Sequence, residues 1–164
     1  MHVNLESMGD RTRFSGLDDQ PHYSAGMEVV KTYTKCHRLM SHRLAELDLS
    51  VAQHEVLLAI GREEGLSQAD LATRLLVAKS NVTALLKRME VSDLVERRRD
   101  PIDKRAHQVH LTEAGRALLR RSARIQGDVV ALMTDGLSED QIRAVEASMR
   151  HVGRSLSAAL APDA

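Results

Sequence analysis

The chain has 164 residues, of which 43% are hydrophobic and 28% are charged, and its 23 basic and 23 acidic side chains give a formal charge of zero. This composition is typical of a soluble globular domain, and a domain of this size needs neither disulfides nor a structural metal to stay folded. The single cysteine excludes an intrachain disulfide. No apolar run reaches the roughly 18 residues of a membrane span, and the first residues lack the basic-then-apolar order of a secretion signal. We therefore expect a cytoplasmic protein with no membrane partner.

Charge is unevenly distributed along the chain. Between Arg74 and Thr134 there are 13 basic and seven acidic residues, so this stretch carries about +6 and the remainder about −6. Such polarity favours one face for an anionic partner, although a solvated helix face has the same composition. The three aromatic residues are too few for the stacking surfaces of proteins that bind single-stranded nucleic acid.

Local signals predict long helices at both ends of the chain. Residues 1–22 lack periodicity and predict a flexible arm. An apolar stripe at spacings of three and four predicts a helix over 24–47. Three capping boxes, in which a serine is followed three residues later by Gln or Asp, predict helices over 51–64, 67–75 and 138–160.

The middle of the chain predicts a polar helix followed by a basic hairpin. Residues 78–92 place apolar side chains on one side and polar or basic ones on the others. Strands over 94–99 and 106–112 flank the turn sequence Asp-Pro-Ile-Asp-Lys-Arg, and Thr112 caps a helix over 113–134. The predicted fold is mainly helical with a small β-hairpin wing: a winged helix-turn-helix over 49–111 and long dimerisation helices over 23–48 and 112–161.

This order of elements is that of winged DNA-binding domains, in which the polar helix enters the major groove and the hairpin contacts the neighbouring backbone or minor groove. Small and amide side chains near the start of the entering helix can reach base edges, and Lys or Arg farther along can reach phosphates. The helix over 78–92 carries both kinds of side chain, namely Lys79, Ser80, Asn81, Thr83, Lys87 and Arg88.

Residues 67–115 resemble the MarR family of bacterial transcription regulators. The strongest matches are Leu-Val-Glu-Arg at 94–97, Asp-Pro-Ile-Asp-Lys-Arg at 100–105 and Leu-Thr-Glu-Ala-Gly at 111–115. The resemblance implies a homodimer on double-stranded DNA, with Asp103 orienting Arg105 into the minor groove and Lys104 at the wing tip. It places Ser80, Asn81 and Thr83 at the major groove, and it favours phosphate contacts for Lys79, Lys87 and Gln68. Arg88 and Arg97 complete the DNA-binding residues that we expect.

The resemblance also implies a small-molecule effector, such as an aromatic or phenolic anion, bound between the dimerising helices and the winged domain. Polar or soft side chains on the first, second and fifth helices could face that pocket, and the candidates are Tyr33, His37, Arg38, Met40, His54 and Arg121. Some members of the family sense oxidants through a cysteine, and Cys36 could do the same or simply fill space in the core. The histidines lack the spacing that puts two metal ligands on one helix face, so no metal site and no cofactor are expected.

Two other classes of function compete with a DNA-binding regulator. An enzyme is disfavoured because the chain has no phosphate-binding glycine loop and no recognisable nucleophile or metalloprotease motif. A winged helix that binds another protein is disfavoured by the arginines at 97–99 and by Lys104 and Arg105. The sequence therefore predicts a ligand-responsive repressor that binds a pseudo-palindromic operator as a homodimer, with a protein-interaction module or a cysteine-based redox sensor as the alternatives.

Overall fold

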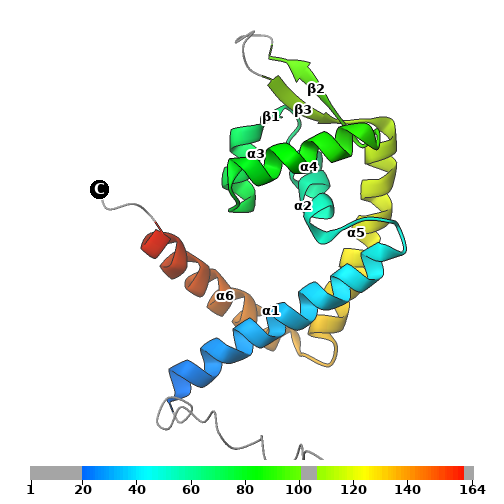
Figure 1. The fold of residues 1–164 in the computed structure, drawn as a ribbon. Helices are drawn as coiled ribbons and strands as arrows, with labels where there is room; N and C mark the ends of the chain where they lie inside the picture. Colours follow the sequence, from blue (N-terminus) through cyan, green and yellow to red (C-terminus); the bar gives the residue numbers. More distant parts are fainter. Residues whose placement is uncertain (1–19, 101–106, 161–164) are drawn as a thin grey trace, which may run out of the picture.

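The computed structural model describes residues 20–100 and 107–160. It has six helices and three strands in these ranges, and Figure 1 shows their arrangement. The expected wing tip, with Asp103, Lys104 and Arg105, and most of the expected arm over 1–22 lie outside the described residues. The elements are α1 (Pro21–Ala45), α2 (Val51–Arg62), β1 (Leu66–Ser67), α3 (Gln68–Leu75), α4 (Lys79–Val91), β2 (Val95–Arg99), β3 (His107–Leu111), α5 (Glu113–Thr134) and α6 (Glu139–Leu160).

The predicted helices and hairpin are confirmed, with bounds that differ by one to three residues in most elements and with one additional strand. Helix α1 begins at Pro21, three residues before the predicted start, because proline lacks the N–H that a first-turn residue leaves unpaired and its φ already suits a helix. Strand β1 was not predicted. Its two residues are too few to show alternation, and they become a strand only by pairing with β3, where Leu66 lies opposite Val109.

The three predicted capping boxes are present. The Ser50 hydroxyl accepts a hydrogen bond from the Gln53 backbone N–H at the start of α2, and the Gln53 side chain accepts one from the Ser50 N–H. Ser67 and Asp70 form the same pair at α3, and residues 138 and 141 form it at α6. These local bonds satisfy backbone N–H groups that the helices cannot pair themselves, and they explain why the helix starts were predictable.

The winged domain has a closed apolar core. Strands β2 and β3 form an antiparallel hairpin, β1 completes the sheet in the order β1-β3-β2, and α2, α3 and α4 pack beneath it (Figure 1). The fully buried side chains come from each of these layers and include Leu57, Ile60, Leu71, Leu86 and Val109.

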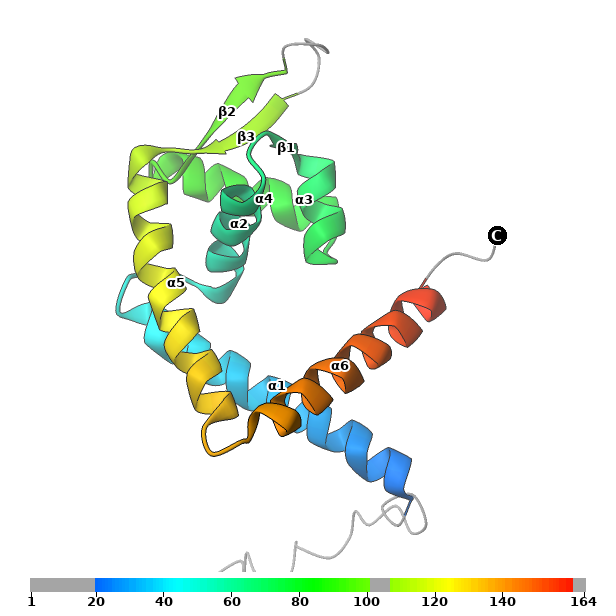
Figure 2. The same ribbon diagram turned by 180° about the vertical axis from the view of Figure 1, so that it is seen from behind.

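Helix α5 starts against this domain and leaves it. A Cβ at Gly115 would lie 1.9 Å from the Leu94 carbonyl oxygen, so only glycine permits this close approach of α5 to the start of β2. Helix α5 runs down past α2 and α1, and α6 turns back and crosses α1 in both views (Figures 1 and 2). No residue of α6 is buried. The fold thus separates a packed winged domain from helices that extend beyond it.

Candidate nucleic-acid interface

Helix α4 presents a polar face that nothing in the described structure covers. Its apolar side chains Val82, Leu86 and Met89 are buried in the core. Six polar side chains on its other faces are exposed: Lys79, Ser80, Asn81, Thr83, Lys87 and Arg88. The N-terminal end of α4 therefore offers hydroxyl and amide groups, with cationic groups before and after them.

Three of the expected DNA-binding residues meet in one internal network. When the Gln68 side-chain amide is turned so that its oxygen faces Arg97, this oxygen accepts hydrogen bonds from both terminal nitrogens of Arg97, at 3.0 and 3.1 Å, and the amide nitrogen donates to Thr83 Oγ1 at 3.1 Å. This orientation agrees with Thr83 donating its own hydroxyl proton to the Lys79 carbonyl at 2.9 Å. Arg97 also pairs with Glu90, with 3.1 Å between Nε and Oε1. The network joins α3, α4 and β2 and so fixes how α4 is presented.

The wing is basic on its exposed residues. Arg98 pairs with Glu96 on the same strand, and Arg99, the last residue of β2, is exposed. The tip residues lie outside the described residues, so their roles remain expectations.

A second network, which we call the wing-base network, runs along β3 and was not predicted. It consists of Arg116, Glu64, His110, Gln108 and Asp100. The Glu64 carboxylate contacts two side chains. Its Oε1 pairs with the Arg116 guanidinium, and its Oε2 lies 3.0 Å from His110 Nδ1. The Gln108 side chain lies 3.3 Å from His110 Nε2 and donates to Asp100 Oδ2 at 2.8 Å. No local sequence pattern pairs His110 with Glu64, 46 residues away.

The expected effector residues do not come together in one place. Met40 and His54 are buried in the core, whereas His37, Arg38 and Arg121 are exposed. Tyr33 lies with Cys36 on a mainly apolar cavity of about 400 Å³ between α1 and α6, which Met133 of α5 also lines. Cys36 is a half-buried free cysteine at this cavity.

His54 is a buried histidine between α2 and α5. Its Nδ1 lies 3.0 Å from the Ser122 hydroxyl oxygen, and that hydroxyl is 3.2 Å from the Leu119 carbonyl, which can accept its proton. The Nδ1–H form of the ring fits this arrangement, and it leaves Nε2 with no hydrogen-bond partner among the described residues. Burial lowers the pKa of His54, and the nearby Gln126 amide partly opposes that shift.

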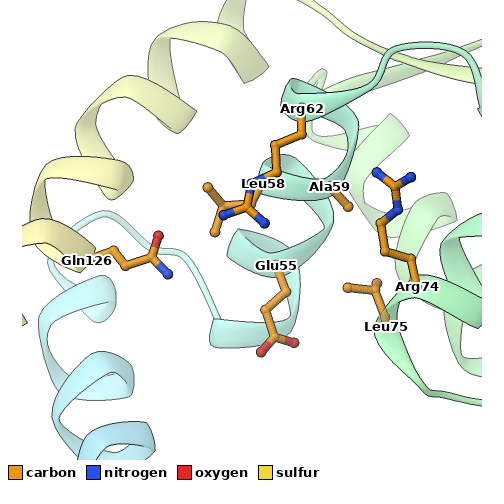
Figure 3. Close-up of a pocket in the computed structure, with 7 residues that line it drawn as sticks. All are labelled: Glu55, Leu58, Ala59, Arg62, Arg74, Leu75 and Gln126. Atoms are coloured by element: carbon orange, nitrogen blue, oxygen red, sulfur yellow. The ribbon is translucent and has the colours of Figure 1, made fainter. Parts of the chain in front are cut away.

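A different cavity of about 270 Å³ lies between α2, α3 and α5. Figure 3 shows the Gln126 side chain approaching it from α5 while Arg62 on α2 and Arg74 on α3 lie on the other side. Arg74 pairs with Glu63, whereas Arg62 forms no ion pair with any described residue. The other residues that line this cavity are Glu55, Leu58, Ala59 and Leu75. The cavity therefore offers two cationic side chains, one carboxylate and apolar groups at the junction of α5 with the winged domain.

The described residues contain no group of three or more His, Cys, Asp or Glu side chains that could hold a metal ion. Within ranges 20–100 and 107–160, no helix is both long and apolar enough to cross a membrane.

Comparisons with known proteins identify proteins that are similar to this chain. A model described as the MarR family matches residues 47–106. The HTH-type transcriptional regulator TtmR of Methylorubrum extorquens is 37% identical over 107 residues, which are 63% of this chain and 54% of TtmR. The HTH-type transcriptional regulator SarZ of Staphylococcus aureus is 35% identical over 96 residues, 58% of this chain and 60% of SarZ. The chain thus spans a little over half the length of these curated relatives.

Solved structures extend the similarity to most of the fold. The reduced form of MarR from E. coli is 30% identical, with a TM-score of 0.69 that covers 77% of this chain and 94% of that one. A mutant of the same protein, complexed with operator DNA, is 29% identical, with a TM-score of 0.71 over 77% of this chain and 91% of that one.

Proposed function

This chain belongs to the MarR family of transcriptional regulators, and we propose that it is a homodimeric repressor that binds a pseudo-palindromic operator in double-stranded DNA and releases it when a small molecule binds. The observation that carries the proposal is the uncovered polar face of α4, which presents Ser80 and Asn81 between cationic side chains. The relatives reported above are named as transcriptional regulators rather than enzymes.

The chemistry of this face suits duplex DNA. An amide such as Asn81 can form two hydrogen bonds with one base edge in the major groove, whereas Lys87 and Arg88 suit phosphates. The α4 network supports this role, because Gln68 contacts the helix through Thr83 and Arg97 contacts it through Glu90. The similar MarR structure from E. coli, which is bound to operator DNA, gives independent support.

The DNA-binding proposal is tested by selecting bound sequences from a random duplex library and measuring equilibrium affinity for the selected site. Asn81→Ala should cost about 1–3 kcal/mol at one base pair and relax the preference there. Lys87→Ala should weaken binding on all sequences and lower the salt slope by about one, whereas Lys35→Ala on α1 should do neither. A wild-type affinity that does not change with salt would overturn the proposal in favour of a protein partner.

The homodimer is supported by the apolar stripe of α6, which stays exposed in the described chain. Its residues are Ile142, Val145, Met149, Val152, Leu156 and Leu160, all exposed. A contiguous apolar surface of this kind usually marks an interface, and a second copy of the same helix and of α1 would cover it. A symmetric dimer would place its two α4 helices on half-sites about one helical turn apart.

The effector is best accommodated by the cavity between α2, α3 and α5. Arg62 and Arg74 suit a carboxylate or phenolate, and Leu58 and Leu75 suit an aromatic body (Figure 3). A ligand there would touch both the dimerisation helix α5 and the winged domain, so its binding could change their relative orientation.

Benzoate and 4-hydroxybenzoate are suitable probes for this cavity. Either should bind the free protein and lower operator affinity, and Arg62→Ala should remove both effects without changing DNA binding in the absence of the probe. Arg121→Ala, an exposed arginine on α5 outside the cavity, serves as the control. If Arg62→Ala binds the probe as tightly as the wild type does, the effector site lies elsewhere. Derepression of a promoter fused to a reporter would separate a repressor from an activator.

A further inference from the structure

We propose that His110 is a positioning residue for DNA binding, and that it holds the base of the wing most firmly when its imidazole is protonated. The inference rests on the DNA-binding function proposed above and concerns a residue with no expected contact to DNA. The wing-base network carries it, because this network connects α5 to the last described residue before the expected wing tip.

Both nitrogens of the His110 ring face hydrogen-bond acceptors. Nδ1 lies 3.0 Å from a carboxylate oxygen of Glu64, and Nε2 lies 3.3 Å from the amide oxygen of Gln108. The orientation of the Gln108 amide is set by its nitrogen, which donates to Asp100 at 2.8 Å. A neutral imidazole has one N–H and can satisfy only one of these acceptors, whereas the imidazolium donates to both. The observed geometry is therefore complete only with a protonated ring.

The two ends of the network are attached to different parts of the fold. Glu64 also pairs with Arg116 in the first turns of α5, so one end is held by the helix that leaves the winged domain. Asp100 directly follows β2 and directly precedes residues 101–106. The His110 side chain is only 15% exposed, so solvent competes weakly for its ring nitrogens.

Other charged groups near His110 are few and mostly paired. Glu96 lies directly opposite on β2, which puts its side chain on the same face, and it is paired with Arg98. Glu63, next to Glu64 in the connection after α2, pairs with Arg74 on α3. Arg116 from α5 opposes a positive charge on His110 through the Glu64 carboxylate that they share.

The direction of the pH effect follows from this geometry. When the imidazolium loses the proton on Nε2, the lone pair of that nitrogen faces the Gln108 amide oxygen, and the two groups repel each other. Gln108 must then move, and its hydrogen bond to Asp100, the residue that follows β2, is lost. Histidine changes charge within the range of about pH 5 to 8. Operator affinity should therefore be highest at the acidic end of that range and fall as the pH rises.

The test measures operator affinity of the full chain between about pH 5.5 and 8.5 at constant ionic strength. The variants are His110→Gln, Gln108→Met and the matched control His107→Gln, an exposed histidine on the same strand. The wild type and the control should lose affinity roughly two- to tenfold across the range, which is the effect of about one net hydrogen bond. His110→Gln and Gln108→Met should show weaker binding that no longer depends on pH.

The Gln108→Met variant separates positioning from simple charge, because it keeps a titrating His110 and removes its connection to Asp100. A pH dependence that persists in this variant would show that the imidazolium attracts DNA directly and would overturn the inference, as would an unchanged profile in His110→Gln. NMR of the DNA-free protein gives an independent readout: the Gln108 side-chain amide and the Asp100 backbone amide should shift with the same midpoint as the His110 ring. Failure of the wild type to bind DNA at any pH would refute the proposed function, whereas unshifted amides would refute this network.

Discussion

Leu86 on α4 and Leu156 on α6 both belong to apolar stripes with helical spacing, yet Leu86 is 0% exposed and Leu156 is 60% exposed. Leu86 belongs to a buried cluster with side chains of α2, α3, β2 and β3, all of which are close to it along the chain. Leu156 is not covered in this way, because it lies in the second half of α6, which extends away from α1 beyond the point where the two helices cross (Figure 2). The same sequence pattern thus completes a core in one region and leaves a surface for another molecule in the other.

The largest effect is expected when charge is placed on the apolar stripe of α6, which tests whether this stripe is an interface. Val145→Glu combined with Met149→Glu should dissociate the dimer, because two carboxylates would have to be buried at its interface. Operator affinity should then fall by about 100-fold or more, since the two winged domains no longer bind as one unit. Light scattering gives the mass and anisotropy gives the affinity.

The matched control adds the same two charges to the opposite face of the same helix, as Ala147→Glu with Ala158→Glu. It should remain dimeric. If the stripe variant is equally dimeric, then α6 is not the interface, and its exposed apolar residues need another explanation.

Truncating one leucine in each region sharpens the comparison. Leu86→Ala should lower the free energy of unfolding of the winged domain by about 2–5 kcal/mol, because it leaves a cavity in a closed core. Leu156→Ala should have an effect that depends on protein concentration, because the residue is buried only when a second copy binds. Denaturant unfolding at two protein concentrations measures both. A concentration-independent loss for Leu156→Ala would mean that α6 packs within its own chain.

The two regions should also differ in their response to acid. Burial lowers the pKa of His54 from 6.5, so the unfolded state binds more protons than the folded state below that value. The free energy of unfolding should therefore be constant above about pH 6.5 and decrease below it, by at most about 1.4 kcal/mol per pH unit for this group. Thermal or denaturant unfolding of His54→Leu should lack this component. His151→Gln, which alters an exposed histidine on α6, should retain it.

The smallest expected difference concerns the capping boxes. Ser67→Ala should cost about 1 kcal/mol of winged-domain stability, because α3 is part of the closed core. Ser138→Ala removes the same bonds from α6, and it should mainly increase amide hydrogen exchange in the first turn of that helix. Equal losses of global stability in both variants would show that α6 unfolds together with the winged domain.

Much of the secondary structure was predictable because its causes are local. The helix over 113–134 was predicted with the bounds that α5 has, since Thr112 caps it and its first turn begins directly after a strand. The alternation of Val109 and Leu111 with polar neighbours predicted β3. Strand β1 was missed because a two-residue strand exists only through its partner.

The candidate site was predictable residue by residue but not as an arrangement. The polar residues of α4 were identified from their type and spacing, and the structure leaves them exposed. Gln68, Thr83 and Arg97 were each assigned to DNA separately, whereas they bond to one another across three elements. The expected effector residues are scattered, and the cavity of Figure 3 consists of other side chains.

Helix starts, strand alternation and the amphipathic stripes depend on residues within a few positions of each other, and the sequence alone determined them. Which stripe is covered, which carboxylate meets His110 and which arginines share a cavity depend on residues up to 71 positions apart, as Glu55 and Gln126 are. Such contacts arise only when packing brings distant segments together, because they carry no local periodicity. Tertiary structure therefore decided the partners, and the sequence decided the elements that meet.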